Sequence, residues 1–129
     1  MSTRAIILAA GRGSRMGNAT ASKPKCLNVL AGKTLLEWQL NSLNKAGIEN
    51  ITIVRGYRAE MLQGNFNVVD NKRWCKTNMV ASLFCAKQVT GNTIISYSDI
   101  VYNSKHIEKL NDSKEDITIT ADKYWESLW

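Results

Sequence analysis

Short apolar segments and amphipathic segments alternate along the whole chain. The short segments are bounded by glycine or polar residues, which is typical of strands buried in a sheet. They predict five strands, over Arg4–Ala9, Asn50–Val54, Asn67–Asp70, Asn92–Ser98 and Asp116–Thr120. The segments between these strands have the hydrophobic spacing of helices.

The clearest helix starts at Thr34–Glu37, which has the spacing of a capping box. Leu36, Leu40 and Leu43 then recur at helical spacing and give the helix an apolar stripe. Gly47 is its expected C-terminal stop, because glycine readily adopts the left-handed conformation that ends many helices.

Three further helices are expected, each after a strand. Their spans are Arg58–Gln63, then Thr77 or Asn78 through Gln88, and finally Ser104 through Leu110. The second of them is expected to turn Met79, Leu83 and Ala86 toward the interior.

The alternation of strands and helices predicts an α/β domain with a doubly wound, mainly parallel sheet and helices on both faces. In such sheets the ligand lies beyond the carboxyl ends of the strands, where the strand order reverses. With the order 3-2-1-4, the first and fourth strands are neighbours at that point. The glycine-rich loop after the first strand then faces Asp99, which follows the fourth strand.

The composition is that of an ordinary globular domain. Of the 129 residues, 44% are hydrophobic and 22% are charged, which argues against wholesale disorder. The apolar run Ala5–Ala10 is much shorter than the roughly 20 residues of a transmembrane helix and too short for a signal peptide. We therefore expect a single domain that is soluble and cytoplasmic and has no membrane partner.

Cysteine and histidine add little chemistry. Cys26, Cys75 and Cys85 form no Cys-x-x-Cys pair and are odd in number, which argues against a disulfide framework and against a zinc site. We expect three reduced thiols. His106 is the only histidine and lies in a helix that we expect to be exposed, so we expect no histidine-based catalysis.

Positive charge is concentrated at the start of the chain. The net charge is +6, and the first 33 residues carry six lysines or arginines and no acidic residue. Such a segment would suit a polyphosphate or a nucleic acid. It contains no interleaved aromatic residues and no nucleic-acid-binding motif, so we do not expect a nucleic-acid partner.

The segment Leu8–Gly17, with the sequence LAAGRGSRMG, directly follows the core of the first strand. Its glycines allow backbone N–H groups to approach a phosphate closely, and Arg15 adds a charged donor. The dinucleotide-binding fingerprint and the P-loop both need glycine at position 16, where Met16 stands. The spacing leaves either a phosphate-binding loop of another kind or a plain surface loop.

Two more residues can contribute to a phosphate site. Lys25 follows Pro24, which stiffens the backbone, so its ammonium can be held in place to contact a phosphate. Asp99 ends the fourth strand, where a carboxylate is well placed to bind Mg²⁺. A solvated lysine and a capping aspartate are the alternatives that these residues alone leave open.

Together these motifs resemble the nucleotidyltransferases of the sugar-phosphate and choline-phosphate type. The resemblance rests on Leu8–Met16, on Lys23-Pro24-Lys25 and on Asp99, and it spans nearly the whole chain. The segments Asn71–Leu83 and Asp122–Trp129 are more similar to phosphocholine and 2-aminoethylphosphonate cytidylyltransferases. The chain looks like the N-terminal half of such an enzyme.

The resemblance implies a Rossmann-like fold, similar to that of the nucleotide-diphospho-sugar transferases but truncated. It also implies Mg²⁺-dependent transfer of a cytidylyl group from CTP to a small phosphorylated or phosphonate acceptor, with release of pyrophosphate. Residues 1–129 would form one NTP-binding domain that lacks the C-terminal half of the family's catalytic domain.

The resemblance further implies roles for individual residues. Lys25 on the α-phosphate and Arg15 on the leaving pyrophosphate are the expected catalytic residues, and Asp99 is the expected Mg²⁺ ligand. Nucleotide contacts are expected from a larger set, namely Leu8, Ala9, Ala10, Gly11, Gly13, Ser14, Arg15, Met16, Lys25, Asn78 and Ser82. The acceptor is expected near aromatic and acidic side chains that suit a quaternary ammonium or aminoethyl cation, namely Tyr97, Asp122 and Trp125.

Two other functions stay open at this point. A sugar-1-phosphate nucleotidyltransferase that uses UTP, dTTP or GTP would share the loop, Lys25 and Asp99, so only the segments near the base and the acceptor discriminate. The other alternative is a nucleotide-binding module without catalysis, which would keep the nucleotide site and no more.

Overall fold

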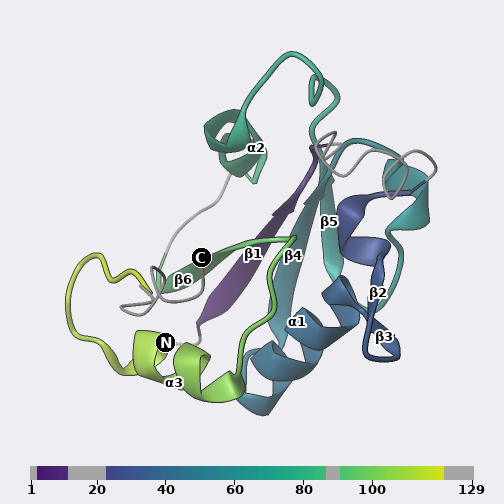
Figure 1. Cartoon of the computed structure of the whole chain (residues 1–129). Helices are drawn as coiled ribbons and strands as arrows, with labels where there is room; N and C mark the ends of the chain where they lie inside the picture. Colours follow the sequence, from purple (N-terminus) through teal and green to yellow (C-terminus); the bar gives the residue numbers. More distant parts are fainter. Residues whose placement is uncertain (1–2, 12–22, 87–90, 121–129) are drawn as a thin grey trace, which may run out of the picture.

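Four parallel strands form one sheet in the computed structural model, which describes residues 3–11, 23–86 and 91–120 (Figure 1). The strands are β1 (Arg4–Ala9), β4 (Asn50–Arg55), β5 (Asn67–Asp70) and β6 (Thr93–Tyr97). Their order is β5-β4-β1-β6, which confirms the predicted order 3-2-1-4 and the α/β class. Strands β1 and β6 are therefore neighbours, with Leu8 opposite Tyr97.

Strand β1 lies at the centre of the core because it is apolar and pairs with β4 on one side and β6 on the other. Ala5 and Ile7 belong to the hydrophobic cluster on one face of the sheet, and Ile6 and Leu8 belong to the cluster on the other. Each of these four side chains is at most 4% exposed. A strand that is apolar on both faces needs helices over both.

Helices α1 (Leu35–Lys45) and α3 (Ser104–Asp112) cover one of these faces and lie against each other (Figure 1). Leu36 and Leu43 of α1 pack into the same cluster as Ile107 of α3. The predicted capping box is confirmed, because the Thr34 hydroxyl accepts a hydrogen bond from the Glu37 backbone N–H at 3.1 Å. The helix ends before Gly47, as expected; this glycine has a φ of +85°.

Helix α2 (Met79–Cys85) covers the other face and is well separated from α1 and α3 (Figure 1). Leu83 and Ala86 pack against the cluster that contains Ile6, as predicted. The expectation for Met79 was wrong, because its side chain is 42% exposed. The helix packs through its last turn, while its first turn lies beside the edge strand β6, where nothing in the described part of the chain covers Met79.

The expected fifth strand over Asp116–Thr120 was also wrong. This segment pairs with no strand of the described sheet, and Ile117 and Ile119 are 85% and 80% exposed. The alternation of apolar and polar residues favours an extended conformation, but a strand also needs a partner. The helix before this segment is capped by Asn103 rather than Ser104, because the Asn103 side chain accepts the Lys105 N–H at 2.8 Å.

Three short elements differ from the expected pattern or were not expected. They are the 3₁₀ helices η2 (Lys25–Leu27) and η3 (Ala59–Met61) and the hairpin of β2 (Val29–Leu30) with β3 (Lys33–Thr34). The helix that we expected over Arg58–Gln63 is only the single turn η3. It follows Arg58, which adopts a left-handed φ of 51°.

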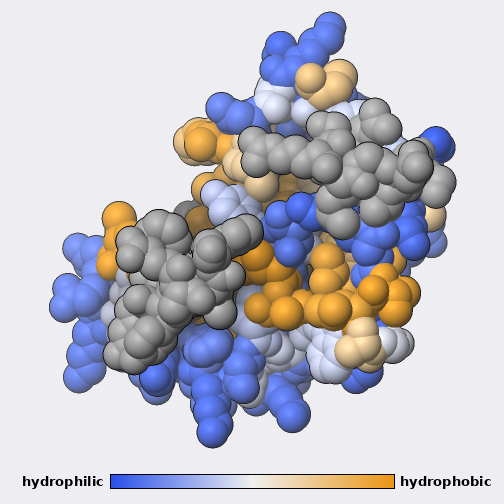
Figure 2. Space-filling model, in the orientation of Figure 1, coloured by the Kyte–Doolittle hydropathy of each residue, from blue (hydrophilic) through white to orange (hydrophobic). Residues whose placement is uncertain are grey.

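Hydrophobic side chains reach the surface over the hairpin (Figure 2), where Val29 and Leu30 are 65% and 48% exposed. No helix among the described residues is long and apolar enough to cross a membrane. The three cysteines are free thiols, as expected, and His106 is exposed on α3.

Candidate functional site

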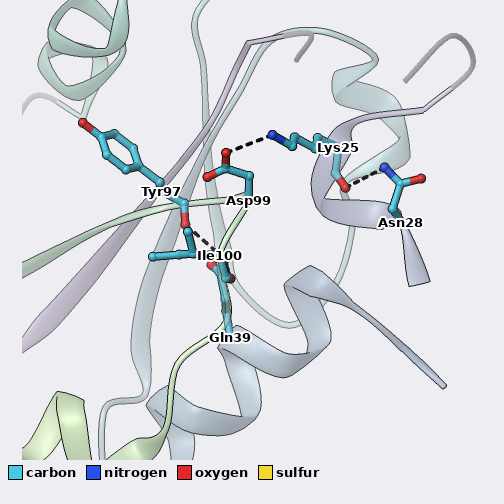
Figure 3. A network of polar contacts seen from close by, with 6 residues as sticks. All are labelled: Lys25, Asn28, Gln39, Tyr97, Asp99 and Ile100. Atoms are coloured by element: carbon cyan, nitrogen blue, oxygen red, sulfur yellow. Dashed lines mark hydrogen bonds and ion pairs between the residues drawn. The ribbon is translucent and has the colours of Figure 1, made fainter. Parts of the chain in front are cut away.

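The fold brings Lys25 and Asp99 together at the carboxyl ends of β1 and β6. The Lys25 Nζ lies 3.0 Å from the Asp99 Oδ2, and the two side chains are 27% and 41% exposed. Figure 3 shows them pointing toward each other, one from η2 and the other from the turn after β6. The structure thus joins two residues that are 74 positions apart in sequence. The expectation that the glycine-rich loop faces Asp99 stays a prediction, because residues 12–22 lie outside the described residues.

Lys25 stands on a well-anchored turn. The neighbouring Pro24 and Cys26 side chains are buried, so the turn is fixed to the core on both sides of Lys25. Asn28 folds back onto this turn, because both its backbone N–H and its side-chain Nδ2 donate to the Lys25 carbonyl, at 3.1 and 3.0 Å. The lysine therefore has a fixed backbone, from which its side chain reaches Asp99.

Asp99 lies in the turn that follows β6. The side chain of Gln39, on α1, donates hydrogen bonds to the Tyr97 and Ile100 carbonyls, at 3.0 and 2.5 Å (Figure 3). One turn further along α1, the Ser42 hydroxyl donates to the Tyr102 carbonyl. The backbone on both sides of Asp99 is thereby attached to one helix.

The glycine-rich loop begins directly after β1, at Ala10 and Gly11. Ala10 is buried, and its carbonyl accepts the Tyr57 N–H at 2.9 Å. Gly11 is exposed, and a Cβ built on it would meet none of the described residues within 4 Å. Leu8 and Ala9 are core residues, at 4% and 3% exposed, so their side chains offer little surface to a ligand. Open space therefore begins at Gly11, where close approach of a phosphate was expected.

The remaining predictions for the loop and the acceptor lie outside the described residues. They concern Gly13, Ser14, Arg15, Met16, Asp122 and Trp125. Their proposed contacts stay predictions.

The start of α2 is organised by Asn71, which the sequence analysis did not single out. Its side-chain Nδ2 donates to the Ser82 and Thr77 hydroxyls, each at 3.0 Å. Ser82 is buried, so its hydroxyl is used inside the protein, whereas Asn78 is exposed and caps the helix by accepting the Ala81 N–H. Asn71 directly follows β5, and nothing in its local sequence distinguishes it from a surface amide.

An apolar groove of about 280 Å³ lies between α2 and the edge strand β6. Leu8, Met79, Val80, Leu83, Ile95 and Tyr97 line it. The Tyr97 ring is on the far side of its strand from Gln39 and points away from Lys25 and Asp99 (Figure 3). The predicted acceptor residue Tyr97 therefore belongs to a groove next to the ion pair rather than to the pair itself.

Burial and hydrogen bonding shift the pKa values of Cys26 and Asp70. Burial raises the pKa of the Cys26 thiol to about 12. On β4 and β5, the Arg55 guanidinium donates to both oxygens of Asp70, at 2.7 and 3.1 Å, and this hydrogen bonding lowers the pKa of the carboxyl. The Cys26 thiol is buried, and the Asp70 carboxylate is occupied by two hydrogen bonds from one guanidinium, so we interpret both as structural.

The chain belongs to the MobA-like NTP transferase domain family, whose model matches residues 5–126. It is 39% identical to a CTP:phosphoglutamine cytidylyltransferase of Campylobacter jejuni, over 97% of this chain and 54% of that protein. It is 35% identical to a 2-aminoethylphosphonate cytidylyltransferase of Lancefieldella rimae, over 81% of this chain and 46% of that protein.

A solved structure shows the same fold. The CTP:phosphocholine cytidylyltransferase of Streptococcus pneumoniae matches with a TM-score of 0.73 and 32% identity, over 77% of this chain and 46% of that one. The predicted resemblance to nucleotidyltransferases, and to the cytidylyltransferase branch, is therefore confirmed. The chain spans about half the length of the curated relatives that it matches.

Proposed function

We propose that this chain carries the nucleotide site of a cytidylyltransferase, which transfers a cytidylyl group from CTP to a small phosphorylated or phosphonate acceptor. The observation that carries the proposal is the Lys25–Asp99 pair, 3.0 Å apart at the switch point of the sheet, where the exposed Gly11 follows the neighbouring strand β1. Ligands of doubly wound sheets bind at this point. The cytidylyltransferases among the relatives support CTP as the nucleotide.

The reaction needs little more than positioning and charge neutralisation. An oxygen of the acceptor's phosphate or phosphonate attacks the α-phosphorus of CTP, and the bond from that phosphorus to the β-phosphate oxygen breaks. Pyrophosphate leaves with that bonding pair. The attacking oxygen is already anionic, so no general base is required. This agrees with the position of the single histidine of the sequence, His106, which is exposed on α3.

Lys25 and Asp99 are arranged so that each can exchange its partner for a ligand. Exposed ion pairs contribute only about 0–1 kcal/mol, and both of these side chains reach solvent. In the proposal, Lys25 contacts the α-phosphate and stabilises the charge that develops there. In the proposal, the backbone N–H groups of Gly11 and Gly13 contact the phosphates. Arg15 neutralises the leaving pyrophosphate.

Asp99 fits the role of a magnesium ligand. Mg²⁺ is usually held by one or two carboxylates together with substrate phosphates and water, and Asp99 supplies one partly exposed carboxylate beside the proposed phosphate position. The described residues contain no cluster of three metal-binding side chains, so most other ligands would come from the triphosphate and water. When bound, the ion would neutralise phosphate charge.

The groove between α2 and β6 is the proposed place for the organic part of the ligands. The exposed Tyr97 ring offers a face to a cationic acceptor group, and Asp122 and Trp125 would complete that subsite. Asn78 and the first turn of α2 would lie near the base and ribose. The test must separate this proposal from two alternatives. One is a sugar-1-phosphate nucleotidyltransferase, and the other is a module that binds nucleotide without catalysis.

Calorimetric titration of the 129-residue chain with CTP, UTP, dTTP, ATP and GTP, with Mg²⁺ and then with EDTA, tests the proposal. We expect CTP to bind most tightly and Mg²⁺ to strengthen its binding. Preference for UTP, dTTP or GTP would favour the sugar-nucleotide alternative. CTP binding without turnover, in the presence of phosphocholine, 2-aminoethylphosphonate or phosphorylated glutamine, would favour the non-catalytic module.

A further inference from the structure

Gln39 is a polar residue whose amide side chain is fully buried, which is unusual for glutamine. Gln39 lies on α1 with no exposed surface, among side chains that are mostly apolar. Its Oε1 is buried and has no hydrogen-bond partner among the described residues. An unsatisfied buried acceptor costs free energy, and an apolar side chain of the same shape would avoid that cost. Packing alone therefore does not explain a glutamine at this position.

The nitrogen of the Gln39 amide explains why a glutamine stands at this position. Both hydrogens of the Gln39 Nε2 are donated, one to the Tyr97 carbonyl and one to the Ile100 carbonyl. With the amide reversed, its oxygen would face two carbonyl oxygens, so the hydrogen bonds fix its orientation. The Tyr97 carbonyl also accepts from the Ser96 hydroxyl at 2.9 Å. The Ile100 carbonyl depends on Gln39 alone among the described residues.

The two carbonyls bracket Asp99. Tyr97 is the last residue of β6, and Ile100 directly follows Asp99. Figure 3 shows Gln39 rising from α1 to this backbone, on the side opposite the Tyr97 ring. The same helix holds the partner of Asp99, because the Leu35 N–H at the start of α1 donates to the Asn28 carbonyl, and Asn28 binds the Lys25 carbonyl. Helix α1 is thus the common support of both charged groups.

We propose that Gln39 is a positioning residue that sets the place of the Asp99 carboxylate relative to Lys25, and so the strength of metal-dependent nucleotide binding. This inference rests on the proposed function. Gln39 touches neither charged group and acts only through the backbone around Asp99. Hydrogen bonds that orient a metal-binding carboxylate commonly affect metal affinity by about 10–100-fold.

The test compares Gln39→Met with wild type in CTP titrations with Mg²⁺ and with EDTA. Methionine has a similar volume and shape but no donor, so we expect the variant to fold. We expect the strengthening of CTP binding by Mg²⁺ to fall about tenfold or more, with binding in EDTA unchanged. Ser42→Ala is the matched control, because it removes the neighbouring hydrogen bond from α1 to the Tyr102 carbonyl. It should leave the magnesium effect as it is in wild type.

A double-mutant cycle with Asp99→Asn separates positioning from a general structural effect. If Gln39 acts through Asp99, Gln39→Met has no further effect in the Asp99→Asn background. An unchanged magnesium effect in Gln39→Met overturns the inference, and so does an equal loss of CTP binding in EDTA or in the Asp99→Asn background.

If the wild-type chain binds no nucleotide, the proposed function fails. A crystal structure of Gln39→Met then still tests whether Gln39 positions Asp99. We expect the 3.0 Å contact between the Lys25 Nζ and the Asp99 Oδ2 to be lost in the variant. Persistence of that contact, with the backbone of residues 97–100 in place, would overturn the positioning role whatever the ligand.

Discussion

Replacement of Gly56 by alanine is expected to destabilise the protein where β4 approaches the glycine-rich loop. A Cβ on Gly56 would lie 2.5 Å from the Ala10 carbonyl oxygen and 2.5 Å from the Trp74 Cβ. Neither atom is the free end of a flexible side chain, and the Trp74 ring is also held edge-to-face against Tyr57, with the ring centroids 5.4 Å apart. The backbone must therefore move.

Overpacking of this kind costs about 1–3 kcal/mol of unfolding free energy. For a domain of this size, each kcal/mol lowers the melting temperature by about 4 °C, so we expect a loss of about 4–12 °C in differential scanning calorimetry. The displaced Ala10 carbonyl precedes Gly11, so we also expect weaker CTP binding.

Gly11→Ala is the matched control because it makes the same chemical change beside the same loop. An added Cβ there meets none of the described residues within 4 Å. We expect the melting temperature to stay within about 2 °C of wild type, because surface substitutions usually change stability by less than about 0.5 kcal/mol. CTP binding should nevertheless weaken, because the open space is the proposed phosphate position. Gly56→Ala with wild-type stability, or Gly11→Ala with wild-type CTP affinity, would refute the reasoning.

Three further predictions follow from single contacts. Lys25→Ala should lower the turnover of CTP by about 10²–10³-fold and weaken CTP binding much less, as measured by pyrophosphate release and calorimetry; equal losses in both would remove its transition-state role. Asp70→Asn should lower the unfolding free energy by up to about 1 kcal/mol at pH 7, because hydrogen bonding to Arg55 lowers the pKa of Asp70. That contribution is present above the ordinary aspartate pKa and is lost as the pH falls through the lower pKa of the folded state, so urea titrations that show the same difference at pH 2 would contradict it. Burial raises the pKa of Cys26 to about 12, so a thiol reagent at pH 8 should modify the exposed Cys75 at once and Cys26 only on unfolding; rapid labelling of Cys26 in the native protein would contradict its burial.

The sequence predicts the sheet and its switch point because both follow from strong, local patterns. The continuous apolar run of β1 identified the central strand, and the alternation of strands and helices then limited the topology to few choices. From that order, the segment after the first strand could be predicted to face Asp99, and the structure confirms the strand order and shows Lys25 in contact with Asp99.

What the sequence could not predict depends on long-range partners. The segment 116–120 has the alternation of a strand, but a strand forms only where a neighbour offers its edge, and periodicity does not report that. Gln39 and Asn71 look like any surface amide in the sequence, and only the packed structure shows that each is buried and binds groups from another element.

The most direct test of the account is a crystal structure of this chain grown with CTP and Mn²⁺, with the anomalous signal used to locate the metal. The account predicts the triphosphate over Gly11, the Lys25 ammonium on the α-phosphate, and a manganese peak within bonding distance of the Asp99 carboxylate. Nucleotide bound elsewhere, or a metal bound to the phosphates with Asp99 still paired to Lys25, would contradict it.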